Sequence, residues 1–105
     1  MDVTVKSKIE GLKQKIIPVL ERYPITKAGL FGSVVSGKDG VKSDVDLLIE
    51  FDKDVRLSLL DISGIRLDIM KNIGGRDVDL VEYDFIKPRY RKYILPTEVR
   101  IYEKR

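Results

Sequence analysis

Two acidic residues, Asp44 and Asp46, stand at the start of a hydrophobic segment, residues 43–52, which reads SDVDLLIEFD. Side chains two positions apart on a strand leave the same face, so the two carboxylates would be held close together. Like charges at that spacing oppose each other's ionisation unless a cation compensates them. Lys or Arg could do so, and so could Mg²⁺, which prefers oxygen ligands. The spacing alone is a weak signal, because many strand ends carry acids.

A glycine–serine pair, Gly32-Ser33, precedes these acids and follows another short hydrophobic segment. Glycine lets the backbone approach a ligand closely, and a serine that opens a helix offers a hydroxyl beside free backbone N–H groups. These groups suit phosphate, although a serine that only caps a helix would have the same sequence pattern. A phosphate-binding turn close to paired carboxylates is what metal-assisted phosphoryl transfer requires.

The composition removes several other chemistries. The chain has 105 residues and contains neither cysteine nor histidine, which excludes disulfides, zinc sites built from these residues, and a histidine base. Hydrophobic residues make up 43% and charged residues 35%, which is typical of a folded, water-soluble chain. The N-terminal residues lack the apolar core of a signal peptide, and no apolar run would span a membrane. We therefore expect a cytoplasmic protein.

Charge is distributed unevenly along the chain. Residues 87–105 hold seven Lys or Arg against two Glu, a net charge of +5, whereas the whole chain carries +3. A basic segment that contains tyrosines could bind nucleic acid or an acidic protein. A solvated terminal helix with inward-facing tyrosines explains the same pattern, and no clear aromatic platform is present. Nucleic acid is therefore the least favoured partner.

Helices and strands alternate in the predicted order of elements. Apolar spacing predicts helices over residues 5–22 and 57–72, about one helical turn over 33–37, and a helix over 84–95 that Pro88 interrupts. Strand patterns cover residues 25–32, 43–52, 76–83 and 97–103. This order predicts an α/β fold. The connection between Gly32 and Ser43 is short for a parallel crossover that contains a helix, so we expect a mixed sheet.

A family resemblance rests on residues 32–49, GSVVSGKDGVKSDVDLLI. This stretch resembles the Gly-Ser…Asp-x-Asp signature of the nucleotidyltransferase superfamily, which includes DNA polymerase beta and kanamycin nucleotidyltransferase. The small size, the segment DVDLVEYD (residues 77–84) and the C-terminal pattern are similar to the minimal nucleotidyltransferases. These are small prokaryotic antitoxins often paired with HEPN-domain toxins. The resemblance covers about residues 9–103 and implies one minimal nucleotidyltransferase domain over residues 1–105, with a mixed β-sheet flanked by helices.

The resemblance also implies roles for individual residues. The nucleotide would be bound by Gly32, Ser33, Lys42 and Ser43, and the catalytic residues that also ligate two Mg²⁺ ions would be Asp44, Asp46 and Asp79. Asp77 shares a predicted strand face with Asp79, so the pattern does not separate the two. Relatives often read Gly-Ser-x-Ala-Arg-Gly, whereas Ser36 stands here in the place of that arginine. Lys38 or Lys42 would then have to supply the cation.

By the same resemblance, the chain would transfer AMP or another NMP from ATP or another NTP to a hydroxyl group. The acceptor would be a tyrosine on a partner HEPN toxin, and its modification would neutralise the toxin. An acceptor site at a homodimer interface is a second arrangement. The alternative function is a non-catalytic antitoxin or a nucleotide-sensing module that neutralises the toxin by direct contact. The missing arginine favours this alternative, and the retained Gly-Ser pair and acids oppose it.

Overall fold

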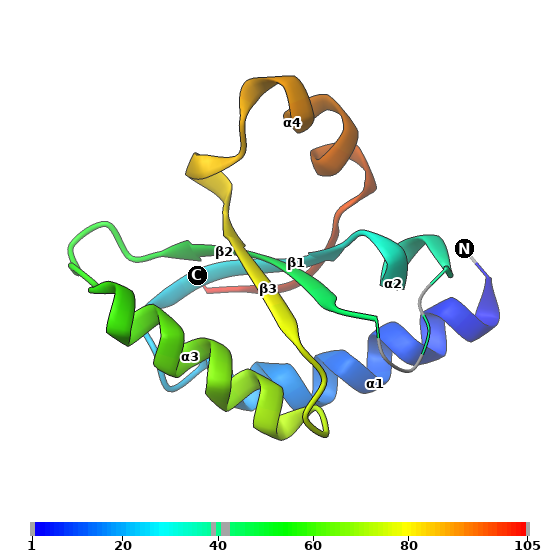
Figure 1. Cartoon of the computed structure of the whole chain (residues 1–105), viewed down its shortest axis with the longest axis horizontal. Helices are drawn as coiled ribbons and strands as arrows, with labels where there is room; N and C mark the ends of the chain where they lie inside the picture. The colour runs from blue at the N-terminus through cyan, green and yellow to red at the C-terminus, as the bar shows by residue number, and fades with distance from the viewer. Residues whose placement is uncertain (1, 39, 41–42, 105) are drawn as a thin grey trace.

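The structure, a computed structural model, describes residues 2–38, 40 and 43–104 (Figure 1). Lys42, one of the residues expected to bind nucleotide, lies outside the described residues. Along the chain the elements are α1 (Val3–Leu20), β1 (Ile25–Phe31), α2 (Ser33–Ser36), β2 (Val45–Phe51), α3 (Leu59–Asn72), β3 (Val78–Glu82), the 3₁₀ turn η1 (Tyr83–Phe85), α4 (Pro88–Ile94), the 3₁₀ turn η2 (Leu95–Thr97) and β4 (Val99–Glu103).

The four strands form one mixed sheet in the order β3-β2-β1-β4. The central strand β1 runs antiparallel to both β2 and β4, and β2 runs parallel to β3. The parallel pair is joined by α3, whereas the antiparallel pair β1–β2 is joined by the short segment that contains α2. The observed pairing confirms the predicted mixed sheet, and the short connection joins an antiparallel pair, as its length favours.

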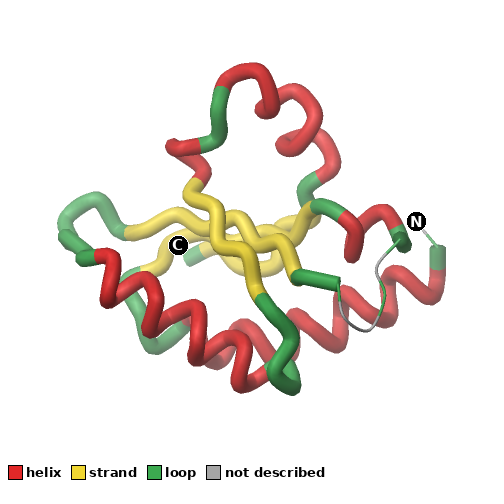
Figure 2. Tube along the Cα trace, in the orientation of Figure 1, coloured by secondary structure: helices red, strands yellow, loops and turns green. Residues whose placement is uncertain are grey.

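Helices α1 and α3 lie together against one face of the sheet, which we call the closed face (Figures 1 and 2). Asp2 caps the N-terminus of helix α1, because its carboxylate accepts a hydrogen bond from the Thr4 N–H at 2.7 Å. Ser58 caps helix α3 and forms a reciprocal capping box with Asp61. The alternate residues Val45, Leu47 and Ile49 of β2 are buried under these helices, as the period of two predicts.

The opposite face of the sheet, which we call the open face, carries a smaller apolar cluster. Its buried members are Leu48, Tyr83 and Ile86. It is partly covered by residues 83–98, which contain η1, α4 and η2 and which we call the α4 arm (Figure 1). The arm leaves the sheet after β3 and returns to it at β4.

The expected interruption of a helix at Pro88 is wrong. Helix α4 begins at Pro88 and continues to Ile94, and the residues before it form the separate turn η1. Proline suits the first position of a helix, because its missing N–H would have no partner there and its fixed φ already matches the helix. Within the described residues, none of the helices is both long and apolar enough to span a membrane.

Candidate active site

Two of the predicted acids meet on the open face of the parallel strand pair. Asp46 of β2 is the register partner of Asp79 of β3. Asp44 lies directly before β2, two positions from Asp46. On β2, Asp46 lies between the buried residues Val45 and Leu47 of the closed face, so the same strand anchors the core and presents a carboxylate on its other side.

Electrostatic interaction joins the three predicted acids. The pKa of Asp46 is raised above its usual value, first by partial burial and then by the negative charges of Asp79 and Asp44. Burial and like charge both disfavour the ionised carboxylate. Asp46 is therefore the centre of a crowded negative cluster that a cation would relieve.

The donor chemistry of this cluster suits a hard cation such as Mg²⁺, since all three groups offer carboxylate oxygens. Across the part of the chain that the structure describes, however, no three acidic side chains stand close enough together to form a ready-made metal cage. Mg²⁺ is usually held by one or two carboxylates together with waters and substrate phosphates. The Asp46–Asp79 pair, with Asp44 beside it, fits that mode, in which phosphate oxygens complete the ligand set.

The structure separates Asp79 from Asp77, which the sequence pattern left open. The Asp77 carboxylate lies 3.8 Å from the guanidinium of Arg66 on α3. The Asp77 carbonyl accepts a hydrogen bond from the Val45 N–H at 2.9 Å, which holds the chain just before β3 against β2. Asp77 is thus engaged with the helix on the closed face, and Asp79 is the acid that faces Asp46.

Gly32 brings the backbone of the Gly-Ser turn against the acids. Its φ of 73° lies in the left-handed region that glycine adopts without strain. A Cβ added at this position would overlap the carboxylate of Asp46, so only glycine allows so close an approach. The turn and the acid cluster therefore form one site, with Ser33 opening α2 directly after the glycine.

Ser43, a further predicted nucleotide-binding residue, and Ser36, which stands in place of the expected arginine, both have local partners. The Ser43 hydroxyl accepts a hydrogen bond from the Gly40 N–H at 2.8 Å, and the Ser43 carbonyl accepts one from Arg76 Nη2 at 3.0 Å. The Ser36 hydroxyl donates to the carbonyl of Ser33 at 3.2 Å. Ser36 therefore bonds within α2, where the arginine of relatives would offer a cation.

An open pocket of about 510 Å³ lies beside the turn, lined by Gly32, Val35, Ser36 and Thr97. Sequence reasoning did not find Thr97, which belongs to η2 at the end of the α4 arm. No spacing pattern links it to Gly32. The two residues meet because the sheet order places β4 next to β1.

Comparison with known proteins identifies the family of the chain. The family model described as "Polymerase beta, Nucleotidyltransferase" matches residues 14–105. The chain belongs to this family and is a nucleotidyltransferase, as the Gly-Ser…Asp-x-Asp resemblance indicated. Two relatives from Methanocaldococcus jannaschii are provisionally named protein adenylyltransferases. MJ0435 is 32% identical over 93 residues, which cover 89% of this chain and 97% of that one. MJ1379 is 29% identical over 87 residues, which cover 82% and 86%.

Solved structures share the fold. A structure provisionally described as a minimal nucleotidyltransferase has a TM-score of 0.72 and 26% identity, and the match covers 94% of this chain and 95% of that one. A toxin–antitoxin crystal structure with AMP-PNP has a TM-score of 0.73 at 19% identity, covering 89% and 74%. The complex of a tri-AMPylated Shewanella oneidensis HEPN toxin with its MNT antitoxin has a TM-score of 0.66 at 16% identity, covering 90% and 72%. The predicted α/β fold with a mixed sheet is confirmed.

Proposed function

We propose that the chain transfers AMP from ATP to a hydroxyl group of a partner protein. The observation that carries this proposal is the pairing of Asp46 with Asp79 beside Gly32, with Asp44 two positions from Asp46. The provisional naming of two relatives as protein adenylyltransferases supports AMP as the transferred group. A protein acceptor and the metal requirement are parts of the proposal that experiment must test.

In this proposal Gly32 and Ser33 bind the triphosphate. A single helical turn carries little macrodipole, so recognition rests on the Ser33 hydroxyl and the first backbone N–H groups of α2. The pocket lined by Gly32, Val35, Ser36 and Thr97 takes the rest of the nucleotide, since its volume of about 510 Å³ lies in the usual range for ligand sites. Lys42 and Ser43 remain proposed contributors to nucleotide binding.

Asp44, Asp46 and Asp79 would hold a pair of Mg²⁺ ions. Bound there, the ions would offset negative charge on the phosphates and make the acceptor hydroxyl easier to deprotonate. During transfer, the acceptor oxygen forms a bond to the α-phosphorus while the bond from the α-phosphorus to the bridging oxygen breaks, and pyrophosphate leaves. The hydroxyl proton needs an acceptor, and because the chain has no histidine, the carboxylate cluster is the group placed to receive it.

The proposed partner is a HEPN-domain toxin, and the acceptor is a tyrosine hydroxyl on it. Support comes from the solved complexes, in which chains of this fold accompany HEPN toxins. Exposed apolar side chains on this chain also fit a protein partner. Leu59 and Leu60, in the first turn of α3, are each 84% exposed, and Phe85 of the α4 arm is 73% exposed. A hollow of about 300 Å³ is lined in part by Leu59, Phe85 and the nearby Val55. We call Val55, Leu59, Leu60 and Phe85 the apolar patch.

The test measures transfer of label from ATP carrying radioactive α-phosphate to a purified HEPN-domain toxin, the proposed partner, in the presence of Mg²⁺. We expect labelled partner with the natural chain and none with the double variant Asp44→Ala/Asp46→Ala. Asp77→Ala is the matched control, because it removes a nearby acid that contacts Arg66 instead of the cluster. Label that persists in the double variant would contradict the proposed site.

A second candidate is a non-catalytic antitoxin that neutralises the toxin by contact. The observation that favours it is Ser36, whose hydroxyl bonds within α2 where relatives often carry arginine. Full neutralisation of the toxin by Asp44→Ala/Asp46→Ala would support this candidate. A homodimer is a further proposed arrangement, in which a second copy contributes the acceptor site. Sedimentation of the chain alone tests it, and a monomer at every concentration would rule it out.

A further inference from the structure

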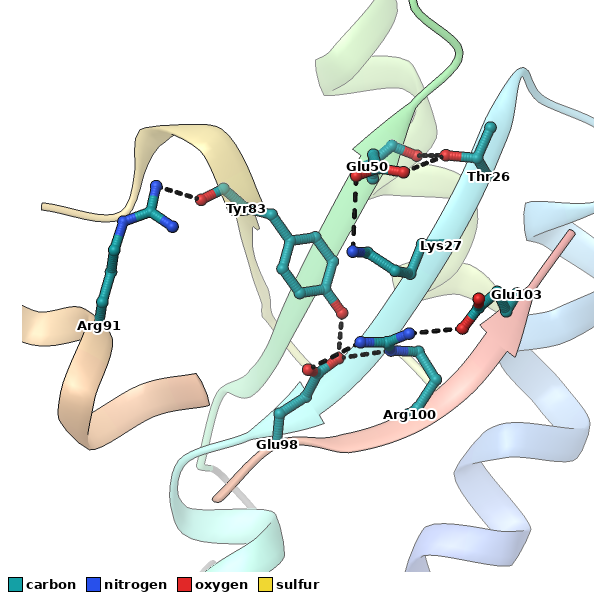
Figure 3. A network of polar contacts seen from close by, with 8 residues as sticks. All are labelled: Thr26, Lys27, Glu50, Tyr83, Arg91, Glu98, Arg100 and Glu103. Carbon is teal, nitrogen blue, oxygen red and sulfur yellow. Dashed lines mark hydrogen bonds and ion pairs between the residues drawn. The ribbon is translucent and has the colours of Figure 1, made fainter. Parts of the chain in front are cut away.

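The α4 arm is fastened at its base by a contact between its first and last residues (Figure 3). The arm leaves β3 at Tyr83 and rejoins the sheet after Glu98. The Tyr83 hydroxyl donates a hydrogen bond to Glu98 Oε2. Arg100 of β4 donates to the same oxygen from Nε at 2.9 Å, and its Nη2 lies 3.3 Å from Glu98 Oε1. These contacts join the two ends of the arm and tie both to β4.

Glu98 occupies a site that the sheet is built to receive. Its side chain is only 6% exposed. A Cβ added at Gly29 of β1 would overlap the Glu98 carboxylate, so the glycine makes the space for it. A buried carboxylate is costly unless it is paired and hydrogen-bonded. Tyr83 and Arg100 meet that requirement, and this combination fixes Glu98 more firmly than a surface ion pair would.

Tyr83 is held from its other side by a cation. The Lys27 ammonium lies 4.3 Å from the centre of the Tyr83 ring and 3.5 Å from Glu50 Oε2. Burial, followed by the hydrogen bond to Glu98, raises the pKa of Tyr83. The hydroxyl therefore stays protonated and remains a donor to Glu98. Within the arm, Arg91 Nη2 donates to the Tyr83 carbonyl at 3.0 Å, which ties α4 to the same anchor.

The residue next to this anchor lines the pocket beside the Gly-Ser turn. Thr97 precedes Glu98 directly and shares the pocket with Gly32, Val35 and Ser36. The Thr97 hydroxyl donates to the Ile94 carbonyl at 2.9 Å, so Thr97 is also tied to the end of α4. Thr97 therefore lies between two held points, the end of α4 and the anchored Glu98.

We propose that Glu98 is a positioning residue for nucleotide binding, which acts through Thr97. Glu98, held by Tyr83 and Arg100 above Gly29, fixes the pocket wall so that ATP binds tightly without touching the carboxylate. This inference rests on the proposed function, because it assumes that the pocket holds the nucleotide. It predicts a change in nucleotide affinity and no loss in the rate of the chemical step, since the acids and the Gly-Ser turn stay in place.

The test measures binding of AMP-PNP with Mg²⁺ to the full chain by calorimetry, together with KM for ATP and kcat for label transfer. We expect Glu98→Gln to weaken AMP-PNP binding and raise KM roughly five- to tenfold, because a charge-assisted bond to Arg100 is lost. Tyr83→Phe keeps the ring under Lys27 and removes the hydroxyl, and we expect a smaller increase of roughly threefold. For both variants kcat should stay within about twofold of the natural value.

The matched control is Glu103→Gln, which removes the other carboxylate bonded to Arg100, at 2.5 Å, on the side away from the arm. It should leave AMP-PNP binding unchanged. Natural affinity in both Glu98→Gln and Tyr83→Phe, or a fall in kcat at unchanged KM, would overturn the inference. A lowered melting temperature at unchanged KM would also overturn it, because the role would then be structural only. If the natural chain does not bind AMP-PNP, the proposed function fails, and the inference fails with it.

Discussion

The closed and open faces of the sheet hold their side chains by different means. On the closed face, Leu47 and its apolar neighbours are fully buried under α1 and α3. On the open face, Asp46 and Asp79 stand side by side, and the α4 arm is anchored through charged and aromatic contacts. Strand β2 serves both faces, since neighbouring residues point in opposite directions. Core packing and the proposed chemistry therefore fall to alternate residues of one strand.

The largest expected effect is a loss of label transfer when an acid of the open face is removed. Asp79→Asn removes a carboxylate that faces Asp46, whereas Asp77→Asn removes one beside Arg66. We expect Asp79→Asn to lower label transfer by roughly a thousandfold, because metal ions supply several kcal/mol of charge stabilisation in such reactions. Asp77→Asn should stay within about threefold of the natural rate. Equal losses in the two variants would mean that the structure does not distinguish the two acids functionally.

The second prediction concerns the stability of the core on the closed face. Leu47→Ala should lower the free energy of unfolding by about 2–5 kcal/mol, because it leaves a cavity in a fully buried position. Urea denaturation measures this loss. In conditions where the variant is still folded, its affinity for AMP-PNP should match that of the natural chain. A large loss of affinity with little change in stability would show that the two faces are not separable.

A smaller effect concerns the apolar patch. Leu59→Ser/Leu60→Ser should weaken binding to the proposed HEPN-domain partner roughly tenfold, because buried apolar side chains carry much of the energy of protein interfaces. The melting temperature should hardly change, since both leucines are 84% exposed. Leu67→Ser, on the same helix and 56% exposed, is the control and should bind normally. Unchanged binding in the double variant would remove the patch from the interface.

The smallest effect is a gain in stability without metal. The pKa of Asp46 is raised in the folded state, so ionisation of this group opposes folding as pH rises through that raised pKa. Asp46→Asn should therefore raise the melting temperature by a few degrees at most in metal-free buffer at neutral pH. Below the pKa of an unfolded aspartate the difference should vanish, because both chains are then uncharged at this position. A lower melting temperature at neutral pH would argue against a crowded cluster.

The alternation of Val45, Asp46, Leu47 and Leu48 already predicts which side chains of β2 face the helices and which face away. The sequence does not contain the register between β2 and β3, which depends on how α3 packs, so Asp79 could not be separated from Asp77. Thr97 and Glu98 were not predicted at all. They reach Gly32 and Gly29 only because β4 returns to the edge of β1, a long-range pairing that no local pattern encodes.

The central claim is that carboxylates from β2 and β3 share cations with a nucleotide bound at the Gly-Ser turn. Anomalous diffraction from crystals grown with Mn²⁺ and AMP-PNP tests it most directly, because Mn²⁺ accepts the same oxygen ligands as Mg²⁺. We predict Mn²⁺ within bonding distance of Asp46 and Asp79, with Asp44 as a further ligand and the triphosphate against Gly32 and Ser33. AMP-PNP bound elsewhere, or Mn²⁺ that contacts none of these aspartates, would contradict the account.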